Sequence, residues 1–462
     1  MTSVSARRWL KACIIPAAAL AALAAPGGAS AALGTQCSGA NITGQGANAL
    51  KNAHAIWDAA FNTATKSKAA CAGAKGQGTL QKPLVSYTTS SAAVGLESWG
   101  ANKHGTANFS LTNAFIGASE PPNAAQKSEI ESFETTSTPS ALLSIPTVQT
   151  AIAVIVNLPT GCTATSKKDA GRLELNNKTL EAIFKGDIKE WGEIKDDGDT
   201  ITGTGCATAA IQPVVRLDGA GTTHIFKKYL SLIDEGTFTD EKEATETWNG
   251  TSEGTLNTDW PKAANVQRPA KTGDTAIDAW VAEHPGTISY TTFAEARANG
   301  SFAANPASPG TGGPNTARFW VPIQNNGLAT GTESKKFKYA DPSSNGDVST
   351  VANANCKDTE YTNGSVAFPP ENVQQPWDEV TTSTIEKKYP LCSIVVELAL
   401  TNYSAFPGTS VEEATTVHDF FNFVTNSKGG GGQKAVEGHD YLALPKGAIL
   451  EEAQHGASLI GF

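Results

Sequence analysis

The segment that decides the fold is Ile211-Gln-Pro-Val-Val-Arg-Leu-Asp-Gly-Ala-Gly-Thr-Thr-His-Ile-Phe-Lys-Lys-Tyr-Leu230. Its first part, residues 211–216, is short, β-branched and apolar, which predicts a strand. A turn with two glycines follows at 218–222, and residues 223–230 carry apolar side chains at helical spacing. The segment therefore predicts a strand, a glycine turn and a helix in direct succession.

This succession is typical of an anion site in α/β proteins. The first N–H groups of a helix have no partner within the helix, and the helix dipole favours negative charge beside them. Thr222 and Thr223 add hydroxyl donors, and the guanidinium of Arg216 offers two parallel N–H groups to an oxyanion. The alternative is an ordinary turn, in which Asp218 caps the helix and Arg216 forms a surface ion pair. The segment alone leaves both interpretations open.

Length and charge narrow the class of protein. The chain has 462 residues, enough for two or three domains, and a formal net charge of -10. It has no dense cluster of Lys and Arg, so we expect no nucleic-acid partner. Because the overall field repels anions, an anionic ligand has to be recognised by local donors in a dehydrated cleft.

The first residues have the pattern of an export signal. Three positive residues precede a short apolar run at 12–25, and Ala29-Ser-Ala31 is a small-residue cleavage motif. The sequence therefore predicts a signal peptide over residues 1–31 and an extracytoplasmic protein, whether periplasmic, secreted or associated with the cell envelope. A retained membrane anchor is the alternative, but the apolar run is short and interrupted by Pro16.

The cysteines predict disulfides. The chain has seven, and six of them follow the predicted signal peptide. An even number in an exported chain indicates a disulfide framework, and without a CxxC motif we expect neither zinc nor any other metal or cofactor. Sequential pairing is our preferred prediction because it closes the shortest loops: Cys37–Cys71, Cys162–Cys206 and Cys356–Cys392.

Strand and helix patterns alternate along the chain, which predicts an α/β fold. Residues 142–158 form the most apolar stretch after the signal and are rich in Val, Ile and Thr, so we expect a buried strand or pair of strands there. A helix is predicted over 173–184, with Asn176 or Asn177 as its cap. Residues 298–385 are rich in Gly, Pro, Asn and Ser and are predicted to be long loops or an insertion.

Three more segments combine a strand end with polar residues. They are Thr43-Gly-Gln-Gly-Ala-Asn48 before a helix, Thr88-Thr-Ser-Ser91 after a strand, and Ala118-Ser-Glu120 after another strand. Ligands of open α/β sheets bind beyond the carboxyl ends of strands, so these loops are expected to converge on one site. Each also has a simpler interpretation, as a plain turn or as a carboxylate at a helix start. For His224, a surface or cap position is favoured over catalysis.

The order of these motifs resembles the phosphate-binding proteins of ABC transporters. The resemblance covers most of residues 40–445 apart from 298–385. It rests on eight motifs in the order of that family: Thr43–Asn48 with Trp57, Gly117–Pro122, Ile145–Pro159, Leu175–Trp191, Arg216–Leu230, Pro285–Tyr290, Tyr389–Leu391 and Tyr441–Pro445.

The resemblance implies a type II periplasmic-binding-protein fold. In that fold, two α/β lobes are joined by two crossover strands and close on the ligand. Lobe 1 would comprise residues 36–155 and 396–462. Lobe 2 would comprise residues 156–395, including the insertion at 298–385.

The resemblance also implies a phosphate site. Arg216 would pair with phosphate oxygens, and Asp218 would orient that arginine. Backbone N–H groups would come from Gly221 and Thr222, and Glu120 would accept a hydrogen bond from protonated phosphate, which sulfate cannot supply. The remaining donors would come from the first two strand ends: Ala47, Asn48, Ser90 and Ser91.

Three positions differ from the family pattern. Glu120 replaces an aspartate and is one methylene longer, Ala220 replaces a serine and lacks its hydroxyl, and Asn48 replaces a threonine. These differences affect ligand specificity more than the binding of an anion as such.

The resemblance implies a monomeric, extracytoplasmic protein that captures inorganic phosphate and delivers it to the membrane permease of an ABC importer. The chain has no HExxH motif and no His/Asp cluster with metal spacing, so we expect no enzyme activity. The alternatives are a secreted phosphatase-like hydrolase, or a surface protein with the same fold that binds another oxyanion or none.

Overall fold

The computed structural model describes residues 33, 39–63, 83–102, 110–118, 122–136, 139–166, 171–196, 199–233, 258–302, 317–325, 339–343, 389–437 and 439–462. Residues 31–462 form one compact unit, to which the following description refers. The predicted signal peptide, residues 1–31, and most of the predicted insertion lie outside the described residues.

The unit is built on a mixed sheet in which strands follow the order β2-β1-β3-β12-β4-β8-β7. Strands β1, β2 and β3 are parallel, whereas β12 is antiparallel to both β3 and β4. Two short strands, β9 and β13, also pair with β4. The bounds are β1 Ile42–Ala47, β2 Val85–Ser90, β3 Phe115–Ala118, β4 Leu142–Asn157, β7 Gln212–Pro213, β8 Thr287–Thr292, β9 Arg318–Trp320, β12 Cys392–Leu400 and β13 Tyr441–Leu442.

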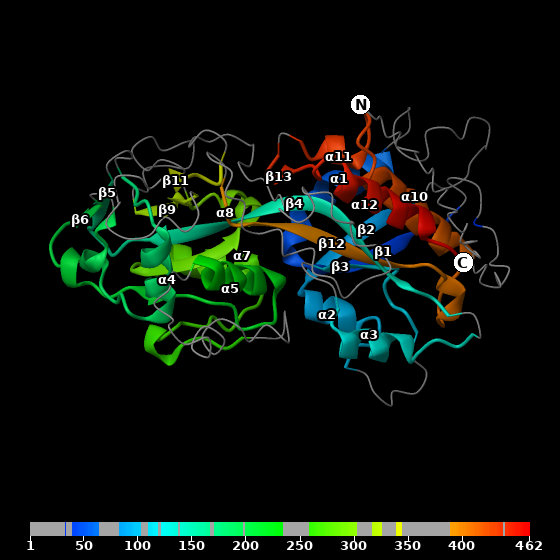
Figure 1. Cartoon of the computed structure of the whole chain (residues 1–462), viewed down its shortest axis with the longest axis horizontal. Coiled ribbons are helices and arrows are strands. Elements are labelled where there is room, and N and C mark those ends of the chain that lie inside the picture. Colours follow the sequence, from blue (N-terminus) through cyan, green and yellow to red (C-terminus); the bar gives the residue numbers. More distant parts are fainter. Residues whose placement is uncertain are drawn as a thin grey trace, which may run out of the picture. The chain divides into compact units, whose positions relative to one another are not determined.

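Strand β4 connects the two halves of this sheet. Its residues up to Ala151 pair with β12, and those from Ile152 onward pair with β8. We call β1, β2, β3, β12, β13 and the part of β4 up to Ala151 the first half. The second half comprises β7, β8, β9 and the part of β4 from Ile152 onward. Figure 1 shows β4 and β12 running side by side from one half toward the other. The predicted apolar stretch is thus one long strand, buried along its whole length.

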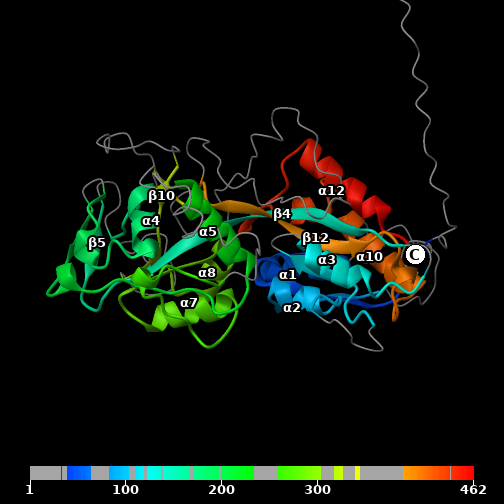
Figure 2. The same cartoon turned by 60° about the horizontal axis from the view of Figure 1, so that its bottom comes forward.

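Helices cover the two halves of the sheet separately (Figures 1 and 2). In the first half, α1, α10 and α12 pack together, and α2 packs on β1 and β3. The helices of the first half are α1 Lys51–Thr63, α2 Ala92–Glu97, α3 Ala124–Glu131, α10 Val411–Val424, α11 Gly432–Ala435 and α12 Ala448–Leu459. Those of the second half are α4 Asn177–Lys185, α5 Gly221–Ile233, α7 Asp274–Glu283 and α8 Phe293–Asn299.

This architecture confirms the predicted α/β fold of periplasmic-binding-protein type. Two small antiparallel pairs lie at the edge of the second half: β5 Thr163–Thr165 with β6 Thr200–Thr202, and β10 Ile323–Gln324 with β11 Tyr339–Ala340. The lobe boundaries predicted from the resemblance stay predictions.

The helix predicted over 173–184 begins later than expected. It starts at Asn177, because the side chain of Asn176 accepts a hydrogen bond from the Thr179 N–H and so caps it. It ends at Gly186, which has a φ of 90°, a conformation that glycine adopts without a steric penalty. The apolar residues before Asn176 are buried outside the helix, and Leu175 among them forms an isolated bridge with Ile323.

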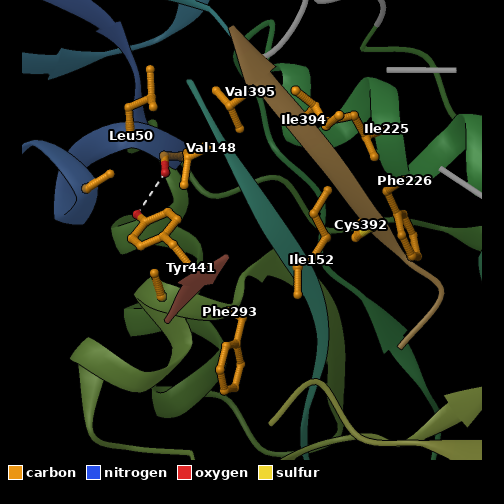
Figure 3. Packing of buried hydrophobic residues seen from close by; sticks show 14 of the residues in the cluster. Leu50, Val148, Ile152, Ile225, Phe226, Phe293, Cys392, Ile394, Val395 and Tyr441 are labelled. Carbon is orange, nitrogen blue, oxygen red and sulfur yellow. Dashed lines mark hydrogen bonds between the residues drawn. The ribbon is translucent and has the colours of Figure 1, made fainter. Parts of the chain in front are cut away.

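One apolar core spans both halves of the sheet. Figure 3 shows Val148 of β4 near Leu50 and Tyr441 in the first half, and Ile394 of β12 beside Ile225 of α5 in the second half. Each large apolar side chain buried in this way contributes about 1.5–3 kcal/mol to stability. The continuous core explains why the two halves form one compact unit.

The predicted disulfide between Cys162 and Cys206 is confirmed, with Cα atoms 5.7 Å apart. It closes a loop of sequence separation 44, for which chain entropy gives about 4 kcal/mol of stabilisation. Cys392 is also disulfide-bonded. The predicted pair Cys37–Cys71 and the predicted partner Cys356 lie outside the described residues.

No helix in the described part of the chain is long and apolar enough to cross a membrane.

A buried ionic cluster joins α1 to β12 in the first half. His54 lies between two carboxylates, with Nδ1 3.0 Å from Oδ1 of Asp58 and Nε2 2.9 Å from Oε1 of Glu397. Its ring stacks on Tyr87 at 3.9 Å between centroids. Burial lowers the pKa of His54, but the Glu397 and Asp58 carboxylates outweigh burial and raise the pKa from 6.5 to about 9. The imidazolium is therefore the stable form at neutral pH.

This cluster predicts a pH-dependent stability. Because the pKa of His54 is higher in the folded protein, its contribution is complete below pH 6.5 and is lost as the pH rises through about 9. We expect the melting temperature to fall between these pH values, and His54→Gln to show a lower melting temperature at pH 6 and a flatter profile. Thermal unfolding across this range measures both, with the exposed His455→Gln as control. Equal slopes for His54→Gln and the unmodified protein would refute the assignment.

Candidate functional site

Two of the predicted loops, those that follow β1 and β2, leave the sheet side by side. Strands β1 and β2 are parallel, and their last residues, Ala47 and Ser90, stand opposite each other. The side-chain amide of Asn48 donates to the carbonyl of Ser90 at 2.5 Å, which ties the two loops together. Ser91 is buried and caps α2 by accepting a hydrogen bond from the Val94 N–H at 3.2 Å.

Tyr87 holds the end of β1 in place through a hydrogen bond. Its hydroxyl donates to the carbonyl of Ala47 at 3.0 Å and lies directly over Gly117 of β3. A Cβ atom at Gly117 would be 2.1 Å from this hydroxyl oxygen, so only glycine allows the contact. Tyr87 also stacks on His54, so the buried ionic cluster of His54 helps to hold Tyr87 and the end of β1 in place.

The predicted strand at 211–216 is shorter than expected. The strand β7 covers only Gln212–Pro213. Val214 then forms a parallel bridge with Gln267, whose carbonyl accepts the N–H of Val215 at 2.9 Å. The glycine turn follows as predicted, and α5 begins at Gly221. Arg216 is thereby placed directly beyond the strand, at the start of the turn.

Arg216 is held between two carboxylates. Its Nε donates to Oδ1 of Asp218 at 2.9 Å, its Nη2 donates to Oδ2 of the same residue, and its Nη1 donates to Oδ1 of Asp274 at 2.5 Å. Arg216 and Asp274 are buried, at 2% and 0% exposure. These bonds use three of the five N–H groups of the guanidinium and leave two. The predicted orientation of Arg216 by Asp218 is present, and the predicted alternative of a surface ion pair is wrong, because the arginine is buried.

Asp274 was missed by the sequence reasoning. The only signal was its position in Thr272-Gly-Asp274, a turn that leads into a helix. It is the first residue of α7, and its Oδ2 accepts a hydrogen bond from the Thr222 hydroxyl at 3.4 Å. Burial raises the pKa of Asp274, and the charge of Arg216 opposes this rise.

The second buried carboxyl of α7 is Asp278, one turn beyond Asp274. Burial raises its pKa well above the usual value, and the neighbouring Asp274 raises it further. The acidic groups bonded directly to Arg216 are Asp218 and Asp274, two carboxyl groups beside one guanidinium.

The start of α5 differs from the expectation at one hydroxyl. Thr222 does face Asp274, but the hydroxyl of Thr223 lies 2.7 Å from the hydroxyl of Tyr290 and so points into the core. The backbone N–H groups of Thr223 and His224 donate to the carbonyl of Ala220. The N–H groups of Gly221 and Thr222 precede the helical hydrogen-bond ladder and stay available to an anion.

The two groups of predicted residues meet at Gly273. This glycine has a φ of 92°, and a Cβ atom there would lie 3.0 Å from the side-chain nitrogen of Asn48. The loops of Ala47, Asn48 and Ser90 thus face the segment of Arg216 and Asp274 across this contact. Glu120 lies outside the described residues, so its predicted role stays a prediction. The arrangement can offer two kinds of donor to an oxyanion, the guanidinium and the helix N–H groups. It also offers carboxylate acceptors.

The part of the chain that the structure describes contains no group of three or more His, Cys, Asp or Glu side chains suited to hold a metal ion.

Comparison with known proteins gives a consistent family and fold. A family model described as the PBP superfamily domain matches residues 32–363. A high-affinity periplasmic phosphate-binding protein (PfluDING), solved with phosphate, superposes with a TM-score of 0.51 at 18% identity, over 90% of this chain and 93% of that one. A human phosphate-binding apolipoprotein gives 0.50 at 14% identity, with the same coverage. Identities this low show a shared fold.

Substitution of Gly117 tests the support of the loop edge. We expect Gly117→Ala to lower stability by about 1–3 kcal/mol, because the new methyl group displaces the Tyr87 hydroxyl and Leu50. Urea denaturation measures the loss. Gly429→Ala is the control, since a Cβ atom there meets nothing within 4 Å. If both variants unfold at the same urea concentration, the packing described at Gly117 is wrong.

Proposed function

We propose that this chain, which belongs to the PBP superfamily, binds inorganic phosphate between its two lobes outside the cytoplasm and delivers it to the permease of an ABC importer. The similarity to periplasmic phosphate-binding proteins supports the fold required for this function. The delivery step and the monomeric state follow from the motif resemblance, as does the location.

The observation that carries the proposal is the placement of Arg216. A buried guanidinium stands at a strand end beside the start of α5, and two carboxylates fix its plane. Its two remaining N–H groups and the helix N–H groups of Gly221 and Thr222 are donors whose positions are set before the ligand arrives. Preorganised donors in a dehydrated site bind an oxyanion more strongly than mobile surface groups.

The acidic surroundings favour a protonated oxyanion. Sulfate carries no proton near neutral pH, so it would meet Asp218 and Asp274 with lone pairs only. Hydrogen phosphate can donate its proton to a carboxylate and gain a hydrogen bond instead. Asp274 is therefore a candidate acceptor in addition to Glu120, which the family resemblance proposes.

Two other functions stay open to test. A phosphatase-like hydrolase would need a nucleophile beside a base, and the side chains that form ion pairs with Arg216 are the two carboxylates Asp218 and Asp274. A surface protein with this fold would bind another oxyanion or none. Calorimetry with phosphate, arsenate and sulfate, together with turnover of a chromogenic phosphate ester, separates these functions from a phosphate carrier.

Removal of the guanidinium tests the site. We expect Arg216→Ala to reduce phosphate affinity at least about a hundredfold, because charge-assisted hydrogen bonds are lost and two carboxylates remain uncompensated. Isothermal titration calorimetry measures the affinity, and circular dichroism verifies the fold. The exposed Arg268→Ala is the control for loss of one positive charge. Unchanged phosphate affinity in Arg216→Ala would remove Arg216 from the site.

Neutralisation of Asp274 tests the selectivity. We expect Asp274→Asn to weaken phosphate binding about tenfold and to strengthen sulfate binding, since an amide donates to an unprotonated oxygen. Competition titrations with both anions measure the ratio, and the exposed Asp187→Asn is the control. A ratio equal to that of the unmodified protein would assign the acceptor role elsewhere.

A further inference from the structure

We propose that Glu295 of α8 is a positioning residue that holds the two sides of the anion site together and thereby sets oxyanion affinity without contacting the oxyanion. This inference rests on the proposed phosphate-binding function. It assigns a role to a buried carboxylate that no motif of the sequence singled out.

The carboxylate of Glu295 receives hydrogen bonds from three side chains. Oε1 accepts from Nδ2 of Asn52 at 3.0 Å, and Oε2 accepts from Oγ1 of Thr275 at 2.6 Å. Nζ of Lys51 lies 3.1 Å from the carboxylate and donates to the Thr275 hydroxyl at 3.1 Å. The Glu295 side chain is buried, and its four-residue network contains one ion pair.

These partners come from opposite sides of the site. Lys51 and Asn52 begin α1 in the first half and follow Asn48 by a few residues. Thr275 lies in α7 of the second half, directly after Asp274. A single carboxylate thus joins the segment of Asn48 to the segment of Asp274, next to the point where Asn48 faces Gly273.

Two nearby contacts join the same regions. Nη1 of Arg297, also in α8, lies 2.6 Å from Oδ1 of Asp440, and the hydroxyl of Tyr441 donates to the carbonyl of Ala49 at 2.8 Å (Figure 3). Helix α8 therefore contacts the segment before β13, which in turn holds the start of α1. Glu295 is the member of this group that bonds the residue adjoining Asp274.

The cost of burying the Glu295 carboxylate makes its contact with Lys51 and Asn52 depend on the two sides of the site being together. A buried carboxylate loses its hydration and becomes stable only if charged or polar donors replace the water. Thr275 alone provides one such bond, whereas Lys51 and Asn52 provide a charge and an amide only while the two sides are in contact. The network thus stabilises the arrangement in which Asn48 and Arg216 face the same ligand.

Kinetics distinguish this role from a general effect on folding. A contact that forms only when the two sides meet slows ligand release and leaves encounter unchanged. We expect Glu295→Gln to weaken phosphate binding about tenfold, with nearly all of the change in the dissociation rate. Stopped-flow binding and calorimetry measure the rates and the affinity, and thermal unfolding of the phosphate-free protein measures stability.

The control is Glu131→Gln, the same chemical change in an ion pair with Lys127 within α3. It is expected to leave both rates unchanged. Lys51→Ala is the second variant. Its side chain is 37% exposed, so the protein keeps its fold, and it is expected to speed dissociation as Glu295→Gln does. The double variant is expected to release phosphate no faster than the faster single variant, because the two substitutions remove the same contact.

The results separate the two proposals. If the unmodified protein binds no oxyanion, the proposed function fails, and the role of Glu295 fails with it. If the unmodified protein binds phosphate and Glu295→Gln, Lys51→Ala and Glu131→Gln all release it at the same rate, the role of Glu295 is refuted while the function stands. Additive effects of Glu295→Gln and Lys51→Ala would also refute a shared contact.

Discussion

The site depends on one interaction, the burial of Arg216 between Asp218 and Asp274. A buried guanidinium is stable only if its charge is matched, and its two carboxylates provide one charge more than that. They also fix the plane of the guanidinium, so that its remaining N–H groups point in set directions. Thr222 adds a bond to Asp274, which links this ionic group to the first turn of α5. The turn and the two helices α5 and α7 are therefore positioned by the same charges that we propose recognise a ligand.

A similar principle applies in the first half of the sheet. His54 is charged because Glu397 and Asp58 flank it in the core, and Tyr87 carries this fixed geometry to the carbonyl of Ala47. The loops that face Arg216 thus rest on a second buried ionic cluster. The two halves meet at the site through contacts such as the one between Asn48 and Gly273.

The sequence predicted the fold well where a pattern depends on local chemistry. The run of β-branched residues at 142–158 became β4, and the glycine turn before α5 placed Arg216 as expected. It failed where a partner comes from a distant segment. Asp274 looked like a helix-start residue, because nothing near it in the sequence indicates an arginine 58 residues away. Thr223 looked like a ligand donor for the same reason, since its partner Tyr290 lies in β8. The family resemblance brought the loops together, but it did not name the second carboxylate.

The central claim is that an oxyanion binds at the free N–H groups of Arg216, and a crystal structure of the protein grown with phosphate tests it most directly. The account predicts a phosphate within hydrogen-bond distance of the Arg216 guanidinium and of the N–H groups of Gly221 and Thr222, with Asn48 on its opposite side. It also predicts a phosphate oxygen close enough to a carboxylate to require a shared proton. A phosphate bound elsewhere on the protein, with Arg216 contacting only Asp218 and Asp274, would contradict the account.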